Sequence, residues 1–228
     1  DWVFGCSAVS AAMIAGYYDN HGFQNMYTGS TNGGYAPLND TSWSTWTDLS
    51  GASYPNNPLV ASHDGVDGRS TKGSIDDYWI RYNNYDNDPY ISGGWKQHTW
   101  GTAVGDYMKT SQSKYGNVDG STIFYLPEYA EKLTCAEIAS EGIANDGTYG
   151  MKSFYEARGY TVSDCYIQQT DNQANGAFNF ANFKAEIDAG YPVMIHVWGH
   201  SMVGVGYDSA SSMIYIHDTW GDYTEQMP

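Results

Sequence analysis

Three residues of the types that catalyse acyl transfer stand near the two ends of the chain: Cys6, His200 and Asp218. A thiolate attacks a carbonyl, an imidazole moves the proton, and a carboxylate fixes the tautomer of the imidazole. Gly5 and Cys6 open a helix-like run, where unpaired N–H groups and the positive end of the helix dipole favour a thiolate. The backbone N–H of Cys6 is also suited to an oxyanion. We interpret Cys6 as nucleophile, His200 as base and Asp218 as the residue that orients the base; for Cys6 alone, a small buried hydrophobe is the alternative.

Metal binding is the main competing chemistry. His196 and His200 are four residues apart, a spacing that binds zinc on a helix, but they fall in a strand-like run where no such pair forms. We therefore predict no metal in the site and no required cofactor. A structural Ca²⁺ on the acidic clusters of the middle region is one interpretation, and a solvated acidic loop is the other, because no complete EF-hand spacing is present. These clusters are residues 64–68, 76–77 and 86–88.

A buried helix and a sheet must position the three candidate residues. Residues 6–20 contain no proline, are rich in alanine and are apolar nearly all round, which predicts a buried helix. Near the other end, three short β-rich runs separated by Gly and Ser predict consecutive antiparallel strands, with His200 at the start of the second and Asp218 at the end of the third. The predicted strands are residues 192–197, 201–208 and 213–218.

The middle of the chain predicts a large insertion and several short elements. Residues 23–100 are rich in Gly, Asn, Asp, Ser and Trp and show little period, which is typical of a long functional or ion-stabilised loop. Further predicted helices are residues 101–114, 128–141, 147–158 and 179–189, and further strands are 121–126 and 160–168.

This order of elements predicts an α+β protein with one domain over residues 1–228. We expect a helical lobe of about residues 1–160, which includes the insertion, and a β-rich lobe of about residues 161–228. A substrate cleft would lie between the lobes. Its predicted lining is Gly5, Trp198, Gly199 and Trp220.

The segments HSMVGVGY and IYIHDTWG resemble the papain-like pattern of a His-led strand ending in V-G-Y, followed by a strand ending in Asn-Ser-Trp-Gly. His200 matches the catalytic His, Asp218 takes the place of the catalytic Asn, and Trp220 and Gly221 match the Trp-Gly. With GCSAVSAAMIAGYYDNHGF and AGYPVMIHVWGHSMVGVGYD, the chain is similar to the bacterial papain-like peptidases related to bacteriocin-processing, double-glycine peptidases. That branch typically carries Asp as third member. The resemblance implies a papain-like fold and a cysteine peptidase that cleaves peptide or amide bonds through a thioester.

One feature departs from the papain-like pattern. Papain-like enzymes usually carry a Gln about six residues before the Cys, whose side chain completes the oxyanion hole, and position 1 here is Asp. We expect either a Gln in a preceding segment or another donor, for which the N–H of Trp2 is a candidate. The departure keeps open a catalytically silent papain-like module that only binds its ligand. A second alternative is a cysteine acyltransferase or cell-wall amidase on the same fold, because the same triad serves each reaction.

Low Lys content, many Tyr, Trp, Asn and Gly residues, and acidity fit an exported bacterial protein, and the resemblance implies a protein or peptide substrate. The chain carries 10 basic and 26 acidic residues, and its net charge of -16 would repel nucleic acid and anionic membranes. No apolar run reaches 18 residues, so we expect no membrane span. Among three cysteines, Cys135 and Cys165 are the natural disulfide pair and leave Cys6 free, while three reduced cysteines are the alternative. We expect an extracellular or cell-surface location.

Overall fold

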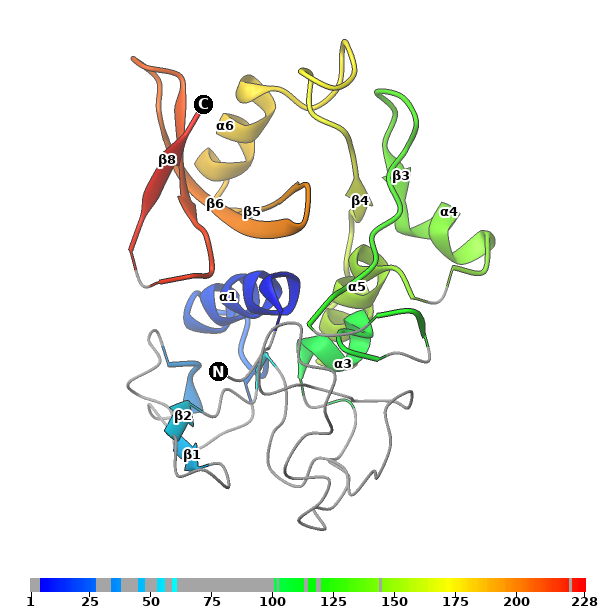
Figure 1. The fold of residues 1–228 in the computed structure, drawn as a ribbon, viewed down its shortest axis with the longest axis vertical. Helices are drawn as coiled ribbons and strands as arrows, with labels where there is room; N and C mark the ends of the chain where they lie inside the picture. The colour runs from blue at the N-terminus through cyan, green and yellow to red at the C-terminus, as the bar shows by residue number, and fades with distance from the viewer. Residues whose placement is uncertain are drawn as a thin grey trace.

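The chain of 228 residues forms an α+β structure with antiparallel sheets, as the order of elements predicted. The computed structural model describes residues 5–27, 34–37, 45–47, 53–55, 59–60, 101, 103–112, 115–117, 120–143, 145–221 and 223–228. In this part of the chain one long helix lies between a four-stranded sheet and a pair of shorter helices (Figure 1).

The long helix, α1 (Cys6–Asn20), has the bounds that the sequence predicted. It begins after Gly5, whose φ of 86° is a left-handed conformation that glycine adopts without strain. Four of its alanines are at most 5% exposed and lie on one face of the helix, while the buried Ser10 and Ile14 lie on another side. Burial on more than one side agrees with a helix that has no distinct polar stripe, and the small alanine side chains let neighbours approach one of these sides closely. These alanines are Ala8, Ala11, Ala12 and Ala15.

Four antiparallel strands form the C-terminal sheet, in the order β5-β6-β7-β8. The three predicted strands are present, and β8 was not predicted because its three residues, Glu-Gln-Met, carry no apolar alternation. Trp198 and Gly199 form the turn between the first two strands, so Val197 pairs with His200 and His196 with Ser201. The strands are β5 (Val193–Val197), β6 (His200–Asp208), β7 (Met213–His217) and β8 (Glu225–Met227).

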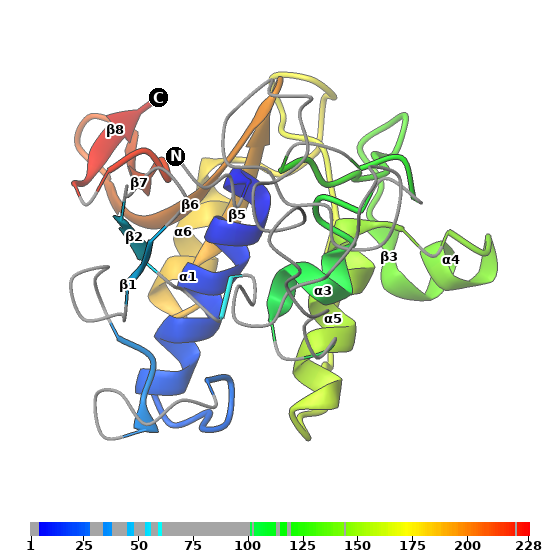
Figure 2. The same cartoon turned by 60° about the horizontal axis from the view of Figure 1, so that its bottom comes forward.

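The two faces of this sheet are covered by different helices (Figure 1, Figure 2). Helix α6 (Phe180–Asp188) packs on one face, where a Cβ on Gly204 would lie 2.4 Å from the ring of Phe183. Glycine at this position therefore lets the helix lie close to β6. Helix α1 covers the opposite face, and successive residues of β6 point alternately toward the two helices.

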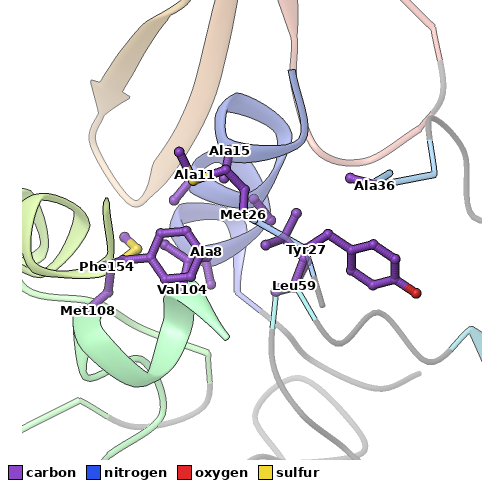
Figure 3. Packing of buried hydrophobic residues seen from close by; sticks show 12 residues of the cluster. Ala8, Ala11, Ala15, Met26, Tyr27, Ala36, Leu59, Val104, Met108 and Phe154 are labelled. Atoms are coloured by element: carbon purple, nitrogen blue, oxygen red, sulfur yellow. The ribbon is translucent and has the colours of Figure 1, made fainter. Parts of the chain in front are cut away.

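The main hydrophobic cluster joins α1 to α3 (Val104–Met108) and α5 (Gly147–Ala157). In Figure 3, Phe154 of α5 and Met108 of α3 lie beside Ala8 of α1. Parts of the predicted insertion also belong to this cluster, so the insertion contributes to the core as well as to the surface. Its members there are Met26, Tyr27, Ala36, Leu59 and Val60.

A buried carboxylate anchors the start of that insertion to α1. Asp19 is 1% exposed, and its two carboxylate oxygens accept hydrogen bonds from the N–H groups of Met26 at 2.9 Å and Ala36 at 2.8 Å. A buried carboxylate is stable only when such donors satisfy it. The segments at residues 26–27 and 34–37 are thereby held against the helix.

Several elements of the middle region are shorter than predicted. Helix α3 has five residues where the sequence predicted residues 101–114, because the chain turns into left-handed backbone at Lys109, φ 60°, and at Ser111, φ 55°. Helix α4 (Cys135–Ser140) replaces the predicted 128–141. Thr134 caps it by accepting from the N–H of Glu137, and this capping box is a sequence signal that places the true start.

Two predicted strands are also reduced. Of residues 121–126 only Ile123 makes a bridge, to Asp146, and of residues 160–168 only two residues are strand. Those two form β4 (Tyr166–Ile167), which pairs with β3 (Leu133–Thr134). Within the insertion, β1 (Thr45–Thr47) pairs with β2 (Ser53–Pro55), a pairing that the sequence did not predict.

Candidate active site

The first turn of α1 meets the first residues of β6. The backbone N–H of Ser201 donates a hydrogen bond to Cys6 Sγ at 3.3 Å, across 195 positions of sequence. Strand β7 ends at His217, which pairs with Val203, so Ser201 lies beyond the ladder that joins β6 to β7. Its N–H is directed at the sulfur instead. Because Cys6 is also the first residue of a helix, the unpaired N–H groups of the first turn are close to the same sulfur.

His200 begins β6 and is held on two sides. Its Nε2 donates to the backbone carbonyl of Asp218 at 2.6 Å, and its ring stacks on that of Trp220 with centroids 5.6 Å apart and planes 18° apart. Because a carbonyl oxygen only accepts, Nε2 carries the hydrogen. In the neutral ring, Nδ1 is therefore the nitrogen able to take up a proton.

Asp218 contacts His200 in a different way from the one predicted. The sequence predicted that the carboxylate would meet the imidazole, but the main-chain carbonyl of Asp218 makes the contact. The carboxylate turns back on its own backbone, where Oδ1 accepts from the N–H of Trp220 at 2.9 Å. This local turn is favourable for Asp directly after a strand, and it holds Trp220 in the segment that stacks on His200.

A second polar contact joins the same elements on the buried side of β6. Ser201 Oγ lies 2.8 Å from Ser7 Oγ of α1 and 2.9 Å from His196 Nδ1 of β5. The ring of His196 also packs on Phe124, with centroids 4.0 Å apart. Burial lowers the pKa of His196 to about 4, so the ring is neutral near pH 7.

Sequence reasoning missed Ser7 and Ser201, and considered His196 only as a zinc ligand. A signal for part of this contact was present, because a two-residue turn at Trp198 and Gly199 pairs His196 with Ser201 on one face of the hairpin. No local signal joins Ser7 to Ser201, because only the packing of α1 on the sheet brings them together.

The residues predicted to line a cleft lie beside Cys6 and His200. A Cβ on Gly5 would lie 1.8 Å from the carbonyl oxygen of Gly120, so only glycine fits at this position. Trp198 is fully exposed in the turn that leads into His200, with Gly199 at φ 74°, and Trp220 is 71% exposed. Trp2, the candidate second oxyanion donor, lies outside the described residues.

The structure joins Cys135 and Cys165 by a disulfide, and Cys6 is the free cysteine. The Cα atoms of the pair are 5.4 Å apart, and the N–H of Cys135 donates to the carbonyl of Cys165 at 2.9 Å. The bond links the start of α4 to the segment before β4. Of the two alternatives that the sequence left open, the structure therefore has the disulfide and not three reduced cysteines.

One ring nitrogen of each histidine in the 196/200 pair is hydrogen-bonded: Nδ1 of His196 to the hydroxyl of Ser201, and Nε2 of His200 to the carbonyl of Asp218. Among the described residues, no group of three or more His, Cys, Asp or Glu could hold a metal ion. The acidic clusters considered for Ca²⁺ all fall in residues 61–100, outside the described part. Within the described residues, no helix is long and apolar enough to cross a membrane.

Comparison with known proteins supports the resemblance seen in the motifs. Residues 116–228 match the family model described as the Peptidase C39 like family. The match includes the whole C-terminal sheet with His200 and Asp218, and it leaves out α1 with Cys6. Neither the curated proteins nor the solved structures include a significant match. Residues 116–228 are therefore similar to the Peptidase C39 like family, and this match supports a relation to papain-like cysteine peptidases of the bacteriocin-processing kind.

Proposed function

We propose that this protein is a cysteine peptidase that hydrolyses peptide or amide bonds through a thioester on Cys6. The observation that supports this most is the 3.3 Å hydrogen bond from the N–H of Ser201 to Cys6 Sγ. It joins a thiol outside the family match to the strand inside the match that begins with His200. Nucleophile and base are thus on adjacent elements, as covalent catalysis requires.

The proposed reaction uses each group at a stated atom. The sulfur of Cys6, as thiolate, attacks the carbonyl carbon, and the N–H of Cys6 holds the oxyanion together with a second donor, for which the N–H of Trp2 is the candidate. Nδ1 of His200 then gives its proton to the leaving amine. In the second half, His200 takes a proton from water, the hydroxide attacks the thioester, and the C–S bond breaks to release the acid and the thiolate.

We infer that the helical part and the sheet act as two lobes with the substrate between them. Gly5 would line one side, and Trp198, Gly199 and Trp220 the other. The disulfide between Cys135 and Cys165 supports an oxidising compartment, and so the extracellular or cell-surface location that we propose for a bacterial host. A structural Ca²⁺ on residues 61–100 stays a proposal, which an unchanged melting temperature on adding EDTA would contradict.

Asp218 could support His200 through its main-chain carbonyl or through its carboxylate, and one substitution distinguishes the two. If the carbonyl of Asp218 orients His200, Asp218→Asn keeps that carbonyl and should lower kcat by less than about tenfold. If the carboxylate itself supports the imidazolium in the working enzyme, Asp218→Asn should lower kcat by about 10³-fold or more. We expect the smaller effect, because the carbonyl makes the contact in the structure. The kcat of Asp218→Asn on a casein-derived peptide, compared with that of the wild type, would decide.

The decisive experiment measures the rate of Cys6 alkylation by iodoacetamide from pH 4 to pH 10, in the wild type and in His200→Ala. Cys135 and Cys165 serve as the internal control, because a disulfide does not react. We expect a labelling rate already high at pH 5–6 that is lost in the variant, as for a thiolate–imidazolium pair. Cleavage of casein by the wild type, and none by Cys6→Ala, should accompany it.

A labelling rate that rises only near pH 8–9 and ignores His200→Ala would contradict the proposal. That result would favour the catalytically silent binding module. A low-pH labelling rate with transfer of the acyl group to an added amine, and little hydrolysis, would favour the acyltransferase. Cleavage of a peptidoglycan cross-link in place of casein would favour the cell-wall amidase.

A further inference from the structure

We propose that Ser7, Ser201 and His196 form a positioning unit that holds the N–H of Ser201 on the sulfur of Cys6. This inference rests on the proposed function, because it assigns a role to the residues that support the proposed nucleophile. None of the three side chains need touch substrate, so they are positioning residues.

Ser201 is the centre of the unit because its main chain and side chain bind different partners. Its N–H donates to Cys6 Sγ at 3.3 Å. Its hydroxyl lies 2.8 Å from the hydroxyl of Ser7 and 2.9 Å from Nδ1 of His196. The sulfur, α1 and β5 are therefore all bound to one residue of β6, and a shift of any one of them would strain two other hydrogen bonds.

The two hydroxyls of the unit are buried, and the side chain of His196 is half-buried. Ser7 is 5% exposed and Ser201 3% exposed. The Ser201 hydroxyl can donate to Nδ1 of His196 while accepting from Ser7, or accept from His196 while donating to Ser7, and it is saturated in both cases. His196 is neutral at pH 7, because burial lowers its pKa to about 4, so the unit holds no charge next to the sulfur. A satisfied buried network of this kind favours a single geometry.

The neighbouring serine of α1 shows that burial alone does not create the contact. Ser10 is 0% exposed, and its hydroxyl has no hydrogen-bond partner among the described residues. Ser7 and Ser10 thus lie one turn apart on the same helix, and only Ser7 reaches β6 through a hydrogen bond. Ser10 provides a matched control for each variant of the unit.

The experiment compares Ser201→Ala, Ser7→Ala and the control Ser10→Ala. For each variant, the pH dependence of Cys6 alkylation by iodoacetamide and the urea unfolding curve are measured. We expect Ser201→Ala to raise the midpoint of the alkylation profile by about one pH unit, because the N–H that stabilises the sulfur anion is no longer held. Its kcat on casein peptide should fall about tenfold with KM nearly unchanged. Ser7→Ala should shift the midpoint in the same direction by less, and Ser10→Ala should leave it at the wild-type value.

A purely structural role predicts a different pattern. In that case Ser201→Ala and Ser7→Ala would unfold at lower urea, yet keep the wild-type midpoint of alkylation, and the proposal would be overturned. A midpoint that moves equally in Ser10→Ala would also overturn it. A wild type that reacts only near pH 8–9, with no response to His200→Ala, contradicts the proposed function itself, which distinguishes that failure from failure of the positioning unit.

Discussion

Helix α1 joins the rest of the protein in two different ways. Along most of its length the contacts are apolar, with Ala8, Ala11 and Ala15 buried against side chains such as Phe154 (Figure 3). In the first turn the contacts are hydrogen bonds: the N–H of Ser201 donates to Cys6 Sγ, and the hydroxyls of Ser7 and Ser201 bind each other. Apolar contacts have no preferred direction and decide where the helix lies. Hydrogen bonds depend on distance and angle, and they decide how the sulfur faces β6.

The comparison predicts that a change in the apolar part alters stability and that a change in the polar part alters reactivity. The largest effect on stability should come from Phe154→Ala, because this ring is 0% exposed in the main cluster. We expect the free energy of unfolding to fall by about 4 kcal/mol. The alkylation profile of Cys6, measured on the folded fraction, should not change.

Urea unfolding measures the loss, and Tyr129→Ala is the control. Because Tyr129 is 68% exposed, its truncation should lower the free energy of unfolding by less than about 0.5 kcal/mol. Equal losses in the two variants would contradict an apolar cluster that holds α1. A shifted alkylation profile in Phe154→Ala would show that the two parts of the helix do not act separately.

The boundary between the two parts is tested by Gly5→Ala. The new Cβ would meet the carbonyl of Gly120 at 1.8 Å, and the backbone would stay at φ 86°. We expect a loss of about 3 kcal/mol together with slower alkylation of Cys6, because the clash and the strained backbone both fall next to the sulfur. Gly22→Ala is the matched control: its φ is 99° and nothing lies within 4 Å, so only about 1 kcal/mol should be lost, with no change in alkylation. If both variants lose the same amount, the contact with Gly120 does not constrain the site.

His196, which binds the Ser201 hydroxyl beside this first turn, should also make the free energy of unfolding depend on pH. In the unfolded chain the pKa of His196 is the ordinary 6.5. In the folded protein burial opposes the charge and lowers this pKa to about 4. Between these values the unfolded state binds more protons, so stability falls as pH falls. We expect a loss of about 2 kcal/mol between pH 7 and pH 5 from this residue.

His196→Phe keeps a ring against Phe124 and removes the titration. Urea unfolding of both proteins at pH 7 and pH 5 measures the difference. A variant that loses as much stability as the wild type over this interval would place the pH dependence elsewhere.

The smallest effect, and the only gain, should come from Ser10→Ala. Its buried hydroxyl has no hydrogen-bond partner in the part of the chain that the structure describes, so replacing Ser10 with Ala removes an unsatisfied polar group from the apolar part. We expect the free energy of unfolding to rise by about 1 kcal/mol. Ser7→Ala, in the polar part of the same helix, should lower it by a similar amount. Opposite signs of the two changes in urea unfolding would separate the apolar part of α1 from its polar first turn, and a loss in both variants would argue that Ser10 binds a partner.

The sequence predicted the elements whose pattern is local. The alanine-rich run predicted α1 at its observed bounds, and alternation with Gly and Ser breaks predicted the strands that begin near His200 and end near Asp218. The early end of α3 was not predictable in this way. It depends on left-handed backbone at Lys109 and on Gln112, whose side chain donates to the carbonyl of Asp106 after the chain has turned back.

Residue types and local periodicity by themselves indicated the candidate thiol and imidazole and the helix and strands that carry them, and the motifs around these residues carried the resemblance to papain-like peptidases. Only the tertiary structure decided that Asp218 meets His200 through its carbonyl and that Ser201 binds Cys6, Ser7 and His196 together. The physical reason is that periodicity reflects which face of an element is buried. Hydrogen bonds across nearly 200 positions depend on how the buried faces pack, and no local pattern contains that information.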